Sequence, residues 1–285
     1  MATSSLEHSN RRLDPRQFQM TVRRLASALG LGENRSPRLG SGIDFVQSRH
    51  YQPGDSIRAI DWRATARAGV PFLKEYEVPR RTPIWLALDT SASMMFGMGH
   101  QTKYETALLL AGGLGLAAQR AMNPVGIVGV GERSIRTPPS LSQDKMIVWL
   151  QQLSQIQYGE TTAVTERLGE LTSQLRERSM VLLLSDLHDA DIIPALAKLS
   201  LRHECVVLEL RDPASRSLRG VGFLRGREAE TGRPIVTSSR NEERSHQQAL
   251  RRIGVDSLLI DVDRPYLSRL KKFVQSRAIL NPEAR

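Results

Sequence analysis

The chain has 285 residues, of which 40% are hydrophobic and 25% are charged, and this is enough for one large domain or two small ones. Its single cysteine, Cys205, excludes an intramolecular disulfide framework and a cysteine-based zinc site. The formal net charge of +10 favours acidic partners, anionic lipid or nucleic acid. However, the arginines are scattered and no nucleic-acid-binding motif accompanies them, so we favour a solvated basic surface over one that binds nucleic acid.

The N-terminal residues 1–14 are mostly polar and show no periodicity, and we expect them to be disordered. They contain no apolar core of a secretory signal. The longest apolar stretch, Ala107 to Ala118, is shorter than the roughly 20 residues that a membrane helix needs. We therefore expect a cytoplasmic protein with no membrane span.

Residues 15–80 form an N-terminal segment that we expect to pack on the core domain. Phe18, Val22, Leu25 and Leu29 recur at helical spacing after Pro15. A glycine-rich stretch, a Pro-Gly-Asp turn and an alternating strand over Phe72 to Val78 follow.

Residues 81–285 alternate between apolar runs typical of strands and longer amphipathic stretches typical of helices. This alternation predicts a doubly wound α/β fold with a mostly parallel sheet. Predicted strands cover 84–88, 125–130, 134–139 (an edge strand), 180–184, 204–210 and 257–261; predicted helices cover 103–122, 144–156, 161–178, 191–201, 242–253 and 266–278. A small β-ribbon is expected to be inserted at about 213–240, around the turn at Glu230-Thr231-Gly232.

Two of the predicted buried strands end in oxygen-bearing side chains. The strand 84–88 is followed, at alternate positions, by Asp89, Ser91 and Ser93, and the strand 180–184 is followed by Ser185 and Asp186. Ligands of such sheets bind at the carboxyl ends of the strands. Hard oxygen ligands with few charges suit magnesium, which keeps several waters.

This order of residues, with a Gly-x-Thr threonine between the two strands, resembles the metal-ion-dependent adhesion site of von Willebrand factor A domains. The resemblance implies Mg²⁺, or another divalent cation, held by Asp89, Ser91, Ser93, Thr161 and Asp186. Asp186 would then bind through water, and a partner's carboxylate would complete the coordination. Thr162 is an alternative to Thr161, and Glu160 departs from the second glycine usual in that family. The other interpretation is that Asp89 and Thr161 only cap helices.

The segment before the core carries a second resemblance, to the family catalogued as domain of unknown function 58. That family has a glycine-rich lead, an Arg-x-Tyr-x-Pro-Gly-Asp turn and an Ile-Asp-Trp run, and the matching positions include Arg49, Tyr51, Gly54, Asp55, Asp61, Trp62 and Arg67. These residues have either an interaction role or an internal structural one, because buried ion pairs often fix an arrangement rather than supply chemistry.

Proteins resembling this family are associated with MoxR-type AAA+ ATPases in protein remodelling or complex assembly. The resemblance implies a non-catalytic, metal-dependent adaptor that binds such an ATPase and a protein client. The chain has no phosphate-binding loop of its own. Two alternatives are a basic nucleic-acid-associated protein and a magnesium-dependent phosphatase with Asp89 as nucleophile. The phosphatase normally needs a second acid two residues further on, where this chain has Ser91.

Overall fold

The structure is a computed structural model. It describes residues 15–29, 44–77, 82–95, 101–131, 135–154, 163–189, 191–212, 224–227, 234–237, 242–262 and 264–277. The chain divides into two compact units, of which one comprises residues 35–81 and the other comprises residues 1–34 and 82–285. The expected disordered stretch 1–14 lies outside the described residues.

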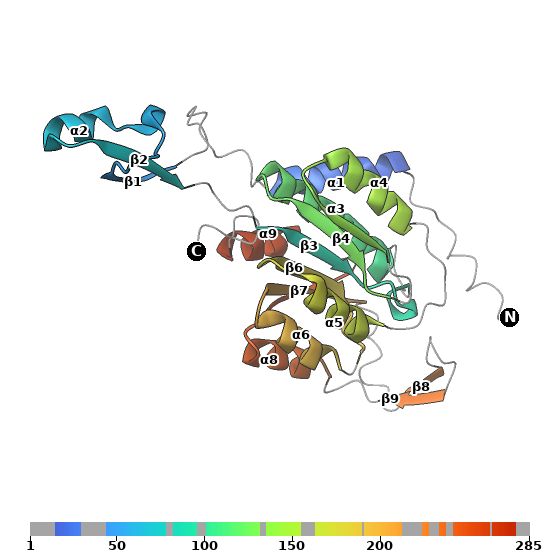
Figure 1. Cartoon of the computed structure of the whole chain (residues 1–285). Coiled ribbons are helices and arrows are strands. Elements are labelled where there is room, and N and C mark those ends of the chain that lie inside the picture. The colour runs from blue at the N-terminus through green and yellow to red at the C-terminus, as the bar shows by residue number, and fades with distance from the viewer. Residues whose placement is uncertain are drawn as a thin grey trace. The chain divides into compact units, whose positions relative to one another are not determined.

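A six-stranded sheet forms the centre of the larger unit (Figure 1). Its order is β10 (Asp256–Asp261), β7 (Glu204–Arg211), β6 (Met180–Ser185), β3 (Ile84–Leu88), β4 (Val125–Gly129) and β5 (Arg136–Ser140). All neighbouring pairs are parallel except β4 and β5. The predicted mixed α/β fold with a mostly parallel sheet is therefore confirmed.

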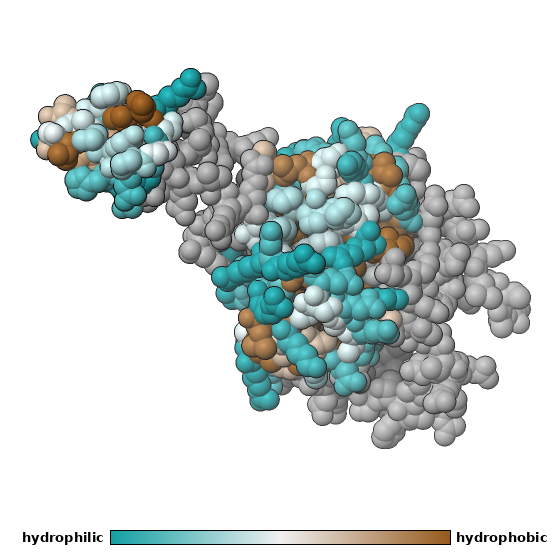
Figure 2. All heavy atoms as spheres, in the orientation of Figure 1, coloured by the Kyte–Doolittle hydropathy of each residue, from teal (hydrophilic) through white to brown (hydrophobic). Residues whose placement is uncertain are grey.

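Helices cover both faces of this sheet, and each face has its own hydrophobic core (Figure 1). On one face lie α1 (Pro15–Leu29), α3 (Lys103–Arg120), α4 (Gln143–Ser154) and α9 (Leu267–Ser276). On the other lie α5 (Val164–Gln174), α6 (Ile192–Ser200) and α8 (Glu242–Arg252). Every residue of β3, β4 and β6 is buried, as expected for strands covered on both sides. Figure 2 shows that the viewed face of the larger unit instead carries mostly hydrophilic residues with scattered hydrophobic ones.

The glycines of α3 allow close packing of helix on helix. A Cβ built on Gly113 would lie 2.4 Å from Cδ2 of Leu25 in α1, and one on Gly115 would lie 1.7 Å from Cε of Met146 in α4. The sequence predicts that these glycines let the helix approach the sheet. The structure shows that they chiefly face α1 and α4, although the Gly115 position also lies 3.0 Å from Cδ1 of Leu86 in β3.

The strand β5 lies at the edge of the sheet and contains Pro138 and Pro139. Proline has no backbone N–H to donate to a neighbouring strand, so it is tolerated at an edge and not in the centre. The predicted edge position of this strand is confirmed.

The smaller unit is built on an antiparallel pair, β1 (Asp44–His50) and β2 (Phe72–Glu77). The connection contains a short 3₁₀ turn, η2 (Ile57–Ala59), and a helix, α2 (Trp62–Ala68). The sequence patterns did not predict β1 or α2. The helix α1, which the sequence places in the segment 15–80, packs on α3 and belongs to the larger unit.

Within the expected ribbon 213–240, the described residues form an antiparallel pair. It consists of β8 (Leu224–Arg227) and β9 (Pro234–Thr237), with Leu224 opposite Thr237.

Candidate functional site

The loop after β3 places three polar side chains at the carboxyl end of the sheet. Asp89 is only 1% exposed, and its Oδ1 accepts a hydrogen bond of 2.9 Å from the backbone N–H of Ser91. The chain then turns into a 3₁₀ helix, η3 (Ala92–Met95). This turn brings the hydroxyls of Ser91 and Ser93 to 3.1 Å from each other.

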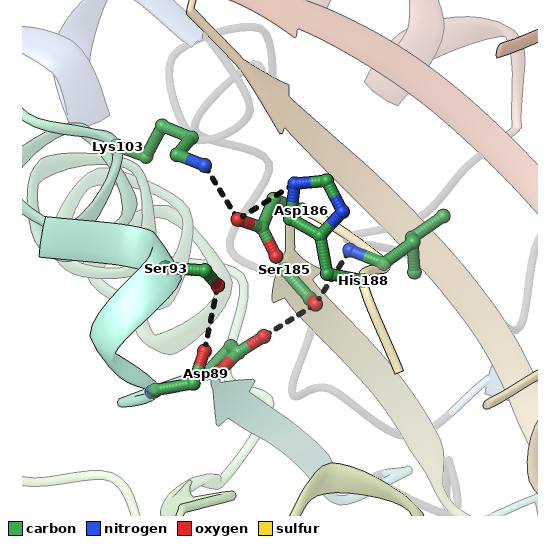
Figure 3. Close-up of polar contacts among 8 residues, drawn as sticks. Asp89, Ser93, Lys103, Ser185, Asp186 and His188 are labelled. Atoms are coloured by element: carbon green, nitrogen blue, oxygen red, sulfur yellow. Dashed lines mark hydrogen bonds and ion pairs between the residues drawn. The ribbon is translucent and has the colours of Figure 1, made fainter. Parts of the chain in front are cut away.

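The end of β6 lies beside this loop because β3 and β6 are neighbouring parallel strands. Ser185 Oγ donates a hydrogen bond of 2.5 Å to Asp89 Oδ2 and accepts one of 2.9 Å from the backbone N–H of Leu187. Figure 3 shows the side chains of Asp89 and Ser93 facing those of Ser185 and Asp186. Four of the predicted metal ligands, Asp89, Ser91, Ser93 and Asp186, are thus brought together.

Asp186 makes its closest contact with Lys103, the first residue of α3. Lys103 Nζ lies 2.5 Å from Asp186 Oδ2, and Nε2 of His188 lies 3.6 Å from the same oxygen. The other carboxylate oxygen, Oδ1, is buried and has no hydrogen-bond partner among the described residues. A buried carboxylate oxygen without a partner is costly, so this atom indicates a place for a cation or a donor.

The electrostatics of the two carboxylates differ. Burial, together with the charge of Asp186, raises the pKa of Asp89 to about 6. Burial by itself also raises the pKa of Asp186, but the adjacent Lys103 and His188, together with the nearby Ser93 hydroxyl, outweigh it and hold that pKa below its usual value. A cation between the two carboxylates would relieve their repulsion.

The residues present fit a hard divalent cation. They supply two carboxylates and two hydroxyls, which are the oxygen ligands that Mg²⁺ prefers. Among the described residues, no group of three or more His, Cys, Asp and Glu side chains is placed to hold a metal. A site here therefore depends on the serine hydroxyls and on the unpartnered Oδ1 of Asp186. Three residues of the predicted site lie outside the described residues. They are Thr161, its alternative Thr162, and Glu160, which stands where the family usually has a glycine.

The sequence reasoning missed Lys103, although two signals mark it. Thr102 and Glu105 form a capping box at the start of α3, which fixes where the helix begins. Lys103 lies one turn before the apolar run that begins at Ala107, and it is only 7% exposed. Lysine is almost never fully buried unless it is paired, so its position predicts a nearby carboxylate.

In the smaller unit, the residues of the Arg-x-Tyr-x-Pro-Gly-Asp turn contact one another. The guanidinium of Arg49 donates two hydrogen bonds of 2.8 Å to the carboxylate of Asp55. Asp55 also accepts a hydrogen bond of 2.9 Å from the backbone N–H of Gln52. Gly54 has a φ of +107°, a backbone conformation that residues other than glycine rarely adopt. The hydrogen bonds from Arg49 and from the backbone N–H of Gln52 hold the pKa of Asp55 below its usual value.

Asp61 organises the second half of this unit. Its side chain accepts hydrogen bonds of 3.1 Å from the backbone N–H groups of Arg63 and Ala64, which caps α2, and one of 2.9 Å from Ser48 Oγ on β1. Trp62, the next residue, is 68% exposed.

Two further signature residues make backbone contacts in this unit. Arg67 Nε donates to the carbonyl of Arg63 at 3.3 Å, and the backbone N–H of Tyr51 donates to the carbonyl of Pro71 at 3.0 Å. The signature residues therefore stabilise the unit and leave one aromatic side chain exposed.

The fold and the site define an α/β protein with an oxygen-rich polar centre where two neighbouring parallel strands end. A family model described as "Protein of unknown function DUF58" matches residues 47–253. The chain belongs to this family, which confirms the resemblance found in the signature segment.

Curated relatives include uncharacterized proteins of Mycobacterium bovis and Mycobacterium tuberculosis. Each is 25% identical over 279 residues, which cover 92% of this chain and 88% of the relative. None of the helices that the structure describes is long and apolar enough to span a bilayer.

Among solved structures, the chain is similar to the conserved hypothetical protein BatB from Bacteroides thetaiotaomicron. The two are 15% identical, with a TM-score of 0.46 and coverage of 69% of this chain and 98% of the other. An uncharacterized membrane spanning protein from Vibrio fischeri is also 15% identical, with a TM-score of 0.22 and coverage of 67% and 96%. At these TM-scores neither likeness establishes a shared fold.

Proposed function

We propose that this chain is a non-catalytic, divalent-metal-dependent protein–protein interaction module. In this proposal its larger unit is a von Willebrand factor A-like domain with a metal-ion-dependent adhesion site. Asp89, Ser91, Ser93 and Asp186 would hold the cation, which when bound offers an open coordination position to a carboxylate of the partner. Thr161 remains a proposed ligand from the sequence.

One observation supports the proposal most directly. The buried carboxylates of Asp89 and Asp186 come from adjacent strand ends, and Oδ1 of Asp186 is buried without a hydrogen-bond partner among the described residues. Lys103 supplies one positive charge against these two carboxylates. A divalent cation would bind the remaining oxygens and offset the excess negative charge.

The proposed partners are a MoxR-type AAA+ ATPase and a protein client of that ATPase, in protein remodelling or complex assembly. This part of the proposal comes from the family resemblance in the signature segment. We also propose a cytoplasmic location, as expected from the sequence.

Metal binding is tested by isothermal titration calorimetry with Mn²⁺ and Mg²⁺ on the full chain. Asp89→Ala should abolish the binding, whereas Asp144→Ala, which removes an exposed carboxylate on α4, should leave it intact. The proposal is wrong if the wild-type chain binds neither ion, or if Asp89→Ala binds them as the wild type does.

The partner is tested by affinity purification from the native host, with Mg²⁺ and with a chelator. An AAA+ ATPase should be retained only with Mg²⁺ and only by the chain that keeps Asp89. Equal retention under all conditions would contradict a metal-mediated contact.

The phosphatase alternative is less well supported by the geometry around Asp89. A nucleophilic carboxylate must reach its substrate, but Asp89 is 1% exposed and its Oδ2 accepts a hydrogen bond from Ser185. This environment suits a ligand-holding residue better than an attacking one.

The nucleic-acid alternative is favoured by one observation in the smaller unit. Trp62 is exposed, and Arg63 and Arg67 lie on the same short helix, α2, where both are also exposed. An aromatic face with neighbouring guanidinium groups can stack bases and contact phosphates. The alternative predicts tryptophan fluorescence quenching by single-stranded oligonucleotides, with an affinity that falls steeply with salt and does not change in Asp89→Ala.

A further inference from the structure

Lys103 and Asp186 form a buried ion pair that links the start of α3 to the end of β6. The two residues are 83 positions apart in the sequence, and Nζ lies 2.5 Å from Oδ2. Each residue is 7% exposed. Burying such a pair removes both charges from water, and only a short, well-oriented contact between them offsets that cost.

The contacts of the Asp186 carboxylate are divided between its two oxygens. Lys103 and His188 both approach Oδ2, whereas Oδ1 is buried and has no hydrogen-bond partner among the described residues. Figure 3 shows the carboxylate lying between Lys103 on one side and the loop residues Ser93 and Asp89 on the other. The ammonium group therefore orients the carboxylate and leaves one oxygen for another cation.

The ammonium also changes the charge balance of the site. Asp89 and Asp186 contribute −2 when both are ionised, and Lys103 contributes +1. With a divalent cation the three side chains and the ion would total +1, whereas without the lysine they would total zero. In a poorly hydrated environment this single charge strongly affects the affinity for both cations and anions.

We propose that Lys103 is a positioning and specificity-determining residue of this site: it weakens the hold on the metal and strengthens the attraction of the metal-loaded site for a carboxylate ligand. This inference rests on the proposed metal-dependent function and names the residue that sets its ligand preference. A purely structural lysine would affect both affinities in the same direction, whereas the proposed role requires opposite directions.

The test compares the wild type with Lys103→Met and Lys103→Arg. Mn²⁺ affinity is measured by electron paramagnetic resonance, and acetate binding to the Mn²⁺-loaded chain is followed by water-proton relaxation, since acetate displaces metal-bound water. In Lys103→Met we expect Mn²⁺ to bind on the order of tenfold more tightly and acetate on the order of tenfold more weakly. Lys103→Arg keeps the charge and should retain both wild-type affinities within a few-fold.

Folding of the Lys103→Met variant is monitored by thermal unfolding with and without Mn²⁺. Because the variant leaves Asp186 unpaired, its melting temperature should be lower without the ion and rise more with Mn²⁺ than that of the wild type. A variant that remains unfolded with Mn²⁺ would overturn the inference, since it would show a structural requirement for the lysine itself.

The outcomes separate this inference from the proposed function. If the wild type binds Mn²⁺ but Lys103→Met weakens Mn²⁺ binding, or leaves acetate binding unchanged, the role of Lys103 is wrong and the metal site stands. If the wild type binds no Mn²⁺, both proposals are overturned, and binding by Lys103→Met alone would show that the ammonium replaces the metal.

Discussion

Ser185 Oγ donates a hydrogen bond to Asp89 Oδ2 at 2.5 Å, which joins the ends of two adjacent parallel strands. The two residues are 96 positions apart in the sequence. The contact fixes the orientation of the Asp89 carboxylate. The other oxygen of this carboxylate, Oδ1, accepts a hydrogen bond from the backbone N–H of Ser91. The site geometry therefore depends on a residue that is not itself a predicted metal ligand.

We expect Ser185→Ala to destabilise the protein by about 1–3 kcal/mol, because it leaves a buried carboxylate oxygen without its donor. The free energy of unfolding in urea measures this effect. Mn²⁺ binding should also weaken, since the carboxylate of Asp89 loses a constraint on its orientation. Ser185→Thr keeps the hydroxyl and is the matched control. An unchanged free energy of unfolding in Ser185→Ala would show that this hydrogen bond is not important for stability.

Gly113→Ala should destabilise the larger unit by about 1–3 kcal/mol, the range for overpacking a core. The added methyl would lie 2.4 Å from Leu25 Cδ2, so α1 and α3 would have to move apart. Alanine is otherwise the better helix former, which makes the sign of the effect informative. Gly169→Ala in α5 is the matched control, because no atom lies within 4 Å of its added Cβ.

Gly169→Ala should stabilise the protein by about 0.5–1 kcal/mol through the conformational entropy of the unfolded chain and the higher helix propensity of alanine. Equal effects of the two substitutions in chemical denaturation would contradict the helix packing described for Gly113.

Cys205 should be unreactive toward thiol reagents in the folded protein at mildly alkaline pH. Burial in β7, together with the charge of Glu204, raises the pKa of this thiol to about 12 from an ordinary value of 9.0. A thiol reagent should label Cys205 only in molecules that have unfolded, so the labelling rate in denaturant measures the unfolded fraction. Rapid labelling under native conditions would show that β7 opens locally around Cys205.

The same pKa shift predicts a dependence of stability on pH. The folded protein keeps the thiol proton where the unfolded chain loses it, so this contribution is complete below pH 9.0 and is lost as the pH rises toward about 12. Cys205→Ala removes this part of the pH dependence. The comparison of urea unfolding for the two proteins across that range measures it.

Asp55→Asn should loosen the smaller unit, because it removes the charged acceptor of Arg49 and of the backbone N–H of Gln52. The contacts hold the pKa of Asp55 low, so their contribution is present above its ordinary value of 3.8 and is lost as the pH falls through the lowered value. Nuclear magnetic resonance titration of the carboxyl carbon and limited proteolysis within residues 44–77 measure these effects. Arg67→Gln is a control that spares this ion pair, and greater sensitivity to Arg67→Gln than to Asp55→Asn would contradict the assigned role.

The sequence by itself determined the main elements of the larger unit and the composition of the candidate site. The strand segments 84–88 and 180–184 are continuous apolar runs because both faces of the sheet are covered. Polar residues directly after such strands indicate an edge where ligands bind, and this rule located Asp89, Ser91, Ser93 and Asp186. Family membership was also readable, since the signature Arg49 to Trp62 is local in the chain.

Only the tertiary structure decided the elements and contacts that depend on distant parts of the chain. The strand β1 has no clear alternation and exists because β2 pairs with it, and α2 is a short helix stabilised by the cap from Asp61. Lys103 and Ser185 acquire their roles from contacts with Asp186 and Asp89 that span 83 and 96 residues. Periodicity reports local burial and helix or strand geometry, whereas the pairing of a buried charge depends on which strand ends become neighbours when the sheet assembles.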